Sequence, residues 1–180
     1  MQDFYDQFWQ TTQLPLRHAR SLERAQAVVQ LLEPNQDKKI LDLGCGCGVV
    51  GEYLKQKGFE VVGVELSSVA AQQARNRGLK VIEKDVFSLE WQEKFPTILA
   101  LEFLEHLPQP QNLLQKIKSW LTPNGKLIAS LPNEFHLLRR LGFAAGYFPF
   151  EGHHYPHLHL FSPHSGKKLL LEAGYSILQT

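Results

Sequence analysis

Four acidic residues follow consecutive apolar runs in the middle of the sequence, at positions where strands are expected to end. They are Asp42, Glu65, Asp85 and Glu102. A glycine-rich loop, residues 44–51, follows the first of them, and glycines let a backbone turn tightly and approach a ligand that a Cβ would push away. Because the carboxyl ends of parallel strands meet at one edge of a sheet, we expect the carboxylates and the loop to line one crevice.

The loop is compatible with two classes of ligand. Its glycines match the dinucleotide pattern G-x-G-x-x-G, and Glu65 follows at a suitable distance for a ribose. The glycines of this match are Gly46, Gly48 and Gly51. A pyrophosphate would be repelled by Asp42 and Glu102, whereas a ligand with a ribose diol, an adenine amine, an α-ammonium and a sulfonium would be stabilised by the same carboxylates. The carboxylates favour the second ligand, and a nicotinamide-dependent oxidoreductase is the alternative.

The elements that must position these residues are indicated by apolar periodicity and capping signals. Short apolar runs alternate with helical stretches at roughly 20-residue spacing, which is typical of parallel strands joined by right-handed crossovers. Ser67 or Ser68 marks one helix start, and Ser162 followed by Pro163 marks another. The expected strands are 39–43, 59–64, 79–82, 97–101, 126–131 (after a turn at 123–125) and 175–178, and the expected helices are 49–57, 68–77, 109–121 and 163–173. The sequence therefore predicts an α/β fold with a doubly wound, mostly parallel sheet.

Two regions lie outside this pattern. Residues 1–36 are expected to form one or two helices, whose aromatic residues would either cover the ligand as a lid or pack against the core. These aromatic residues are Phe4, Tyr5, Phe8 and Trp9. Residues 133–161 form a long aromatic-rich connection, which we predict to be a substrate lid. Its segment 135–143 reads as a short helix with Arg139 and Arg140, suited to a lid, to a membrane-surface patch or to ordinary packing.

Length and composition indicate one domain, residues 1–180, of an ordinary globular type. The chain is 43% hydrophobic, and its net charge of +1 argues against a dedicated nucleic-acid binder. No stretch approaches the ~18 apolar residues of a membrane span, and no signal peptide is evident at the N-terminus. Cys45 and Cys47 suit neither a disulfide framework nor a four-ligand zinc site. We therefore expect a cytoplasmic protein without stable membrane insertion.

Five segments, in order and at suitable spacing, resemble the motifs of class I S-adenosylmethionine-dependent methyltransferases. They are residues 40–48, 62–67, 83–86, 102–107 and 121–127. The resemblance is strongest to the bacterial group of ubiquinone-type O-methyltransferases and MetW-like proteins. It implies a Rossmann-like methyltransferase fold, S-adenosylmethionine as cofactor and methyl transfer to an oxygen of a small molecule. A non-catalytic cofactor-binding protein of the same fold is a further alternative.

The resemblance also implies which residues bind the amino-acid end of the cofactor. Gly44 and Gly46 would approach the methionyl part, with Asp42 nearby. Leu101 and Glu102 would face the α-ammonium group. Together these residues would surround the charged end of the ligand.

A second group of residues is implied to bind the nucleoside end. Glu65 would accept both ribose hydroxyls, and Leu66 would lie against the adenine. Asp85 would take the adenine amine beside the backbone of Val86. Asp85 is also of a type that favours strand-end turns and stays solvated there, so both interpretations are open for it.

Three histidines are candidates for catalysis at the acceptor. His106 would serve as a general base, or would simply complete the helix start after the fourth strand. His157 and His159 project from one side of an extended segment and are able to bind a substrate or a metal. Only Glu151 lies close by in sequence, and the spacing fits no zinc pattern. We therefore expect substrate-facing or solvated histidines and no metal site.

The C-terminal end of the sequence bears on the sheet. Methyltransferases of the class finish with two strands, the last of them antiparallel and inserted between the fifth and sixth. This sequence stops at Thr180, where the sixth expected strand ends. We therefore predict a truncated sheet that lacks the final antiparallel strand and has an exposed edge.

Overall fold

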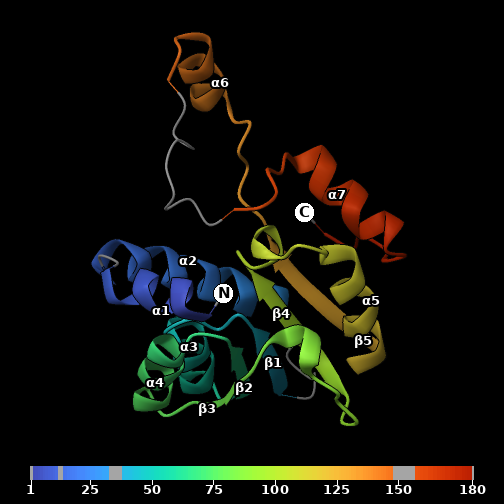
Figure 1. Cartoon of the computed structure of the whole chain (residues 1–180). Helices are drawn as coiled ribbons and strands as arrows, with labels where there is room; N and C mark the ends of the chain where they lie inside the picture. The colour runs from blue at the N-terminus through green and yellow to red at the C-terminus, as the bar shows by residue number, and fades with distance from the viewer. Residues whose placement is uncertain (1, 12–13, 33–37, 148–156, 180) are drawn as a thin grey trace. The chain divides into compact units, whose positions relative to one another are not determined.

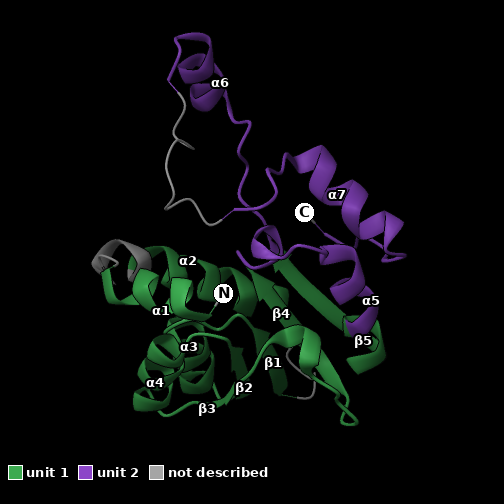
Figure 2. Cartoon of the chain, viewed as in Figure 1, with its two compact units in different colours: residues 1–101, 117–129 green, residues 102–116, 130–180 purple. Residues whose placement is uncertain are grey.

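The structure is a computed structural model that describes residues 2–11, 14–32, 38–147 and 157–179. The chain divides into two compact units (Figure 2). The first unit comprises residues 1–101 and 117–129, and the second comprises residues 102–116 and 130–180. In chain order the elements (Figure 1) are α1 Gln2–Thr11, α2 Leu14–Leu31, β1 Lys39–Leu43, α3 Val49–Gln56, β2 Glu60–Glu65, α4 Ser68–Asn76, β3 Lys80–Glu83, η1 Val86–Ser88, β4 Phe95–Leu101, η2 Leu104–His106, α5 Pro110–Trp120, β5 Leu121–Ser130, α6 Leu137–Ala144 and α7 Pro163–Glu172, where η denotes a 3₁₀ helix.

The five strands form one sheet in the order β3-β2-β1-β4-β5. The pairs β1–β2, β1–β4 and β2–β3 are parallel, with Asp42 opposite Gly63 and Leu99, and Glu65 opposite Glu83. Central strands of a parallel sheet are covered on both faces, which explains why β1 and β4 read as nearly continuous apolar runs. The chain order reverses direction beside β1, so the loop after β1 lies at the switch point of the sheet. The doubly wound prediction is confirmed.

The core of the first unit forms where α2, α3 and α4 pack against the sheet. Its buried members come from all of these helices, from β1, β2 and β4, and from the residue just before β3. They are Val28, Ile40, Leu54, Val61, Ala74, Leu79 and Leu99. Fully burying an aliphatic side chain stabilises a fold by about 1.5–3 kcal/mol, so this cluster holds the strand ends and the following helices in fixed positions.

Helix starts agree with the capping signals in the sequence. The Ser67 side chain accepts a hydrogen bond from the Ala70 N–H at the start of α4. Ser162 and Ser165 form a reciprocal capping box at the start of α7, with Pro163 in its first turn. Residues 1–36 were expected to hold one or two helices, and α1 and α2 confirm this.

At the C-terminal side of the sheet the expected fifth strand is present but starts earlier, and the prediction of a sixth strand was wrong. β5 begins at Leu121, and Asn124, with φ 64°, forms its turn-like kink within the strand. Residues 175–178 form no strand, although they are described. Instead, the Tyr175 N–H donates to the Leu170 carbonyl and its hydroxyl donates to the Leu114 carbonyl at 2.8 Å. Leu178 is 77% exposed, so the apolar run does not bury a face as a strand would. A short apolar run becomes a strand only where the edge of a sheet is available to pair with it.

Among the described residues, the sheet has five strands and no final antiparallel strand, as predicted. None of the helices in these residues combines the length and the hydropathy that crossing a membrane requires.

The short helix expected within 135–143 is present as α6. Its leucines are exposed, so it does not pack as a core helix; these are Leu137 at 67%, Leu138 at 75% and Leu141 at 57%.

Candidate cofactor and acceptor sites

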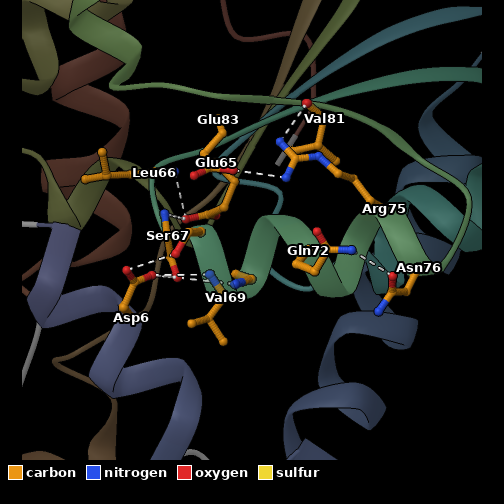
Figure 3. Close-up of polar contacts among 12 residues, drawn as sticks. Asp6, Glu65, Leu66, Ser67, Val69, Gln72, Arg75, Asn76, Val81 and Glu83 are labelled. Carbon is orange, nitrogen blue, oxygen red and sulfur yellow. Dashed lines mark hydrogen bonds and ion pairs between the residues drawn. The ribbon is translucent and has the colours of Figure 1, made fainter.

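Glu65 is fixed at the end of β2 by three backbone N–H groups (Figure 3). One of its carboxylate oxygens accepts hydrogen bonds from the N–H groups of Leu66 and Ser67, both at 2.9 Å. The other accepts the Gly46 N–H at 2.9 Å. Burial raises the pKa of Glu65, against the opposing effect of these hydrogen bonds. The side chain is therefore a positioned acceptor that joins the glycine loop to the start of α4. Three of its roughly four acceptor sites are taken by these N–H groups, and the one left, on the oxygen that accepts the Gly46 N–H, is available to a hydroxyl donor.

Asp42 is buried at the end of β1, with 3% of its surface exposed. Desolvation, followed by the charge of Glu65, raises the pKa of Asp42 to about 7. The same environment raises the pKa of the Cys45 thiol, mainly through burial. Two buried carboxylates with raised pKa values favour a cationic ligand beside them, because positive charge stabilises their ionised forms.

The glycine loop turns back across the ends of β1 and β2. Gly44, Gly46 and Gly48 all have φ between 54° and 81°, a region that strains residues with a Cβ. The N–H groups of Gly44 and Cys45 both donate to the Val64 carbonyl, at 2.9 and 3.1 Å. The loop is thus fastened to β2, and its conformation depends on glycine at these positions.

Helix α1 lies over this loop and over the start of α4. Asp6 accepts hydrogen bonds from the hydroxyls of Ser67 and Ser68, at 2.5 and 3.1 Å, and from the Val69 N–H at 3.3 Å (Figure 3). The Trp9 indole packs on Gly46, where an added Cβ would lie 2.8 Å from ring atom Cζ2. No residue of α1 is buried. These contacts favour the lid interpretation of the N-terminal aromatic residues over the core-packing one.

The residues predicted to bind adenine occupy the segment after β3. Asp85 is exposed and its side chain accepts the Phe87 N–H at 2.9 Å, which caps η1. Val86 is buried and Leu66 is half-buried. One Asp85 oxygen is thus occupied by the turn, as the solvated interpretation expected, and the adenine contact stays a prediction.

Leu101 is half-buried at the end of β4, and Glu102 follows it with φ 49°, a conformation that is rare outside glycine. The Glu102 N–H donates to the Ser130 carbonyl at 3.0 Å, and the Ser130 hydroxyl donates to its carboxylate at 3.1 Å. Strained backbone of this kind is often retained at binding sites. Glu102 belongs to the second unit and the other cofactor candidates to the first.

The three candidate histidines all belong to the second unit, and the structure groups only two of them. The rings of His106 and His157 are 4.9 Å apart between centroids. His159 points elsewhere, because its Nε2 donates to the Leu107 carbonyl at 2.9 Å. His157 Nδ1 instead lies 2.9 Å from a carboxylate oxygen of Glu134, which is buried. His157 and His159 therefore have different partners, and their catalytic roles stay predictions.

Sequence reasoning missed three acidic residues of these sites. They are Asp6, Glu105 and Glu134. Asp6 lies on the helix expected to be a lid, but only the fold places it at the start of α4. Glu105 directly precedes His106, and Glu134 follows the expected fifth strand, which was the available signal for both.

The methyltransferase domain family matches residues 16–180 of the chain. The chain belongs to the class I S-adenosylmethionine-dependent methyltransferases. A ubiquinone biosynthesis O-methyltransferase of Histophilus somni is 33% identical over 129 residues, which are 64% of this chain and 54% of that protein. The chain spans about half the length of the curated relatives it matches.

Two solved methyltransferases share the fold. One, from Thermotoga maritima, is named as a possible histamine N-methyltransferase; it has a TM-score of 0.78 and 22% identity, and the match covers 98% of this chain and 82% of that one. The other is the magnesium protoporphyrin IX methyltransferase of Synechocystis PCC 6803, with a TM-score of 0.71 and 20% identity. The match covers 99% of this chain and 85% of that one.

Membership of this family favours S-adenosylmethionine over the nicotinamide alternative. The donor set fits this cofactor, because two buried carboxylates and a backbone-lined loop suit a ribose diol beside cationic groups.

The raised pKa of Asp42 predicts a pH-dependent stability of the methyltransferase without ligand. The folded-state pKa of about 7 exceeds the unfolded value of about 3.9, so the folded state binds more protons between these values. The free energy of unfolding should fall as pH rises through this window, by up to about 4 kcal/mol from this group alone. Urea unfolding between pH 4.5 and 8 should show a smaller fall for Asp42→Asn than for wild type, and parallel pH profiles would contradict the assignment.

Proposed function

We propose that the chain transfers the methyl group of S-adenosylmethionine to a hydroxyl oxygen of a small molecule. The Histophilus somni relative, named as an O-methyltransferase, supports an oxygen acceptor. The observation that carries the proposal is the Glu65 carboxylate, buried at the end of β2 and held by the N–H groups of Gly46, Leu66 and Ser67. A carboxylate held in this way is arranged before the ligand arrives and suits a hydroxyl donor of the ribose.

The cofactor supplies a methyl carbon activated by its sulfonium. This carbon would be transferred in line to an acceptor oxygen, with the electron pair of the carbon–sulfur bond left on sulfur and the acceptor's proton given up to the chain. Holding donor and acceptor together provides most of the acceleration in such a displacement. The chain would do this by cradling the methionyl part at Gly44 and Gly46, with Asp42 compensating its positive charge. Leu101 and Glu102 would face the α-ammonium group.

The nucleoside end would be held by the remaining candidates. Glu65 would accept a ribose hydroxyl, and Leu66 would cover one face of the adenine. Asp85, with its second carboxylate oxygen, and the backbone of Val86 would bind the adenine edge. The proton of the acceptor would pass to a histidine. His106 and His157 are the better placed, because their rings pack edge to face 4.9 Å apart, whereas the His159 ring is bonded to a carbonyl.

Mass spectrometry of a cell extract supplemented with phenols, catechols, carboxylic acids and amines, incubated with the chain and isotopically labelled S-adenosylmethionine, tests the proposal. We expect label in a hydroxyl-bearing product. Label on nitrogen alone would overturn the oxygen assignment. Tight cofactor binding without transfer to any extract component would favour the non-catalytic alternative.

Once an acceptor is known, histidine variants test the acceptor side. His106→Ala and His157→Ala are expected to lower turnover about a hundredfold, the contribution typical of a general base, while cofactor affinity stays within about twofold. His159→Ala is expected to have a smaller effect. His164→Ala, an exposed histidine on α7, is the matched control and should behave as wild type. Near-wild-type turnover in all of these variants would place the base elsewhere.

A further inference from the structure

Glu105, His106 and His157 bring three metal-ligating side chains together in the second unit. One ligand atom from each lies within 4.8 Å of the others. Ligands at about 2.1 Å from a tetrahedral ion are separated by roughly 3.4 Å, so an inward movement of roughly an ångström would close the set around a cation. The two imidazole planes cross at 73°, which allows their nitrogens to approach one point from different directions.

His157 is oriented by a second carboxylate. Its Nδ1 lies 2.9 Å from Glu134, which is 1% exposed and ion-paired with Arg139. Its Nε2 is turned to Glu105, whose nearer carboxylate oxygen is 4.0 Å away. Metal-binding histidines almost always donate their second ring N–H to a carboxylate or carbonyl in this manner, which fixes the tautomer and makes the ligating nitrogen more basic.

Backbone hydrogen bonds join the segment that carries Glu105 and His106 to the segment that carries His157. The carbonyl of Glu105 accepts the N–H groups of Leu158 and His159, at 2.8 and 3.1 Å. On the other side, His159 Nε2 donates to the Leu107 carbonyl at 2.9 Å. The residues after His157 are therefore fastened to η2, and His157 is presented to Glu105 and His106 by a fixed scaffold.

We propose that Glu105, His106 and His157 bind a divalent transition-metal ion of the zinc class. Two imidazoles and one carboxylate are borderline donors that suit Zn²⁺, Co²⁺ or Fe²⁺ better than Ca²⁺ or Mg²⁺. The Glu105 side chain is fully buried, and a dication beside it compensates the cost of burying its charge. Three protein ligands leave a coordination position open to water or to a hydroxyl oxygen, as in catalytic rather than structural sites.

The sequence indicated a different arrangement. His157 and His159 suggested a pair on one side of an extended segment, with no carboxylate partner of suitable spacing. The fold instead places His157 against the adjacent pair Glu105 and His106. The inference concerns metal binding and does not depend on methyl transfer. Where the ion is bound, His106 and His157 act as its ligands in place of the base role proposed above.

Cobalt binding to the full-length chain tests the proposal without cofactor or acceptor. After removal of metals with a chelator, Co²⁺ is titrated and its visible absorption recorded, and Zn²⁺ is then added in competition. We expect one equivalent of Co²⁺ with micromolar or tighter affinity, absorption typical of nitrogen and oxygen ligands, and displacement by Zn²⁺. Absence of saturable binding would overturn the proposal and would leave the cluster as a hydrogen-bonded network.

Variants separate this site from other histidines. His106→Ala and His157→Ala are expected to lower Co²⁺ affinity at least a hundredfold. Glu134→Gln, which changes only the partner of His157, is expected to lower it about tenfold to a hundredfold. His164→Ala is the control and should bind as wild type. Circular dichroism establishes that each variant is folded, and Co²⁺ binding that survives His157→Ala in a folded protein would overturn the assignment.

Discussion

Replacing Glu65 with alanine is expected to weaken binding of S-adenosylmethionine and of its demethylated product at least tenfold. The variant would lose a hydrogen bond from the ribose to a charged acceptor, which contributes about 1.5–3 kcal/mol. Both ligands carry the same ribose, so both affinities should fall by a similar factor. Isothermal titration calorimetry measures the two dissociation constants directly.

The control for this variant comes from the neighbouring strand. Glu83 is opposite Glu65 in the parallel register, but it is exposed and paired with Arg75 at 3.0 Å. Glu83→Ala should leave both affinities unchanged. Because Glu65 also accepts three backbone N–H groups, Glu65→Gln, which keeps an acceptor oxygen, distinguishes loss of the ribose contact from distortion of the loop. Wild-type affinity in Glu65→Ala would refute the ribose assignment.

Gly48→Ala is expected to destabilise the first unit by about 2–5 kcal/mol. The backbone at Gly48 has φ 81°, which costs a residue with a Cβ roughly 1–2 kcal/mol. The added Cβ would also lie 2.8 Å from the Cβ and 2.9 Å from the Cα of Ala74, so the backbone of α4 must shift. Overpacking of this kind costs about 1–3 kcal/mol more.

Gly146→Ala separates strain from collision. Gly146 has nearly the same φ, 79°, but nothing lies within 4 Å of an added Cβ. Its substitution should cost only about 1 kcal/mol, because the conformational strain is partly offset by a less flexible unfolded chain. Urea unfolding followed by circular dichroism compares the two variants. Equal losses of stability would show that the contact with α4 is unimportant.

Local signals in the sequence were sufficient for most elements. The apolar run at 39–43 and the cap at Ser67 have nearby causes, namely side-chain burial and a hydrogen bond to Ala70. The same kind of signal failed for residues 175–178, because a strand also needs an edge to pair with and Tyr175 is held by Leu114 instead. Periodicity reports which face of a segment is apolar, but not which segment it meets.

In the candidate sites, too, residues marked by a local signal were found from the sequence and residues joined across the chain were not. Glu65 is the last residue of β2, so a strand-end argument was enough to place it beside the glycine loop. The contacts of Asp6 with Ser67, and of His157 with Glu105 and Glu134, join residues far apart in the chain. Such contacts depend on how whole helices and strands pack together, so they could not be predicted from the sequence alone.

The position of Trp9 on Gly46 has a kinetic consequence for the proposed cofactor site. The indole occupies the approach to the loop that the methionyl part would use, and Asp6 fastens the same helix to the start of α4. Cofactor entry then requires α1 to move first, and product departure requires it again. The observed association rate would level off at high cofactor concentration, at the opening rate of α1, rather than rising in proportion to concentration as simple diffusion-controlled binding does. An N-terminal segment outside the sheet would thereby set how quickly the active site is reloaded.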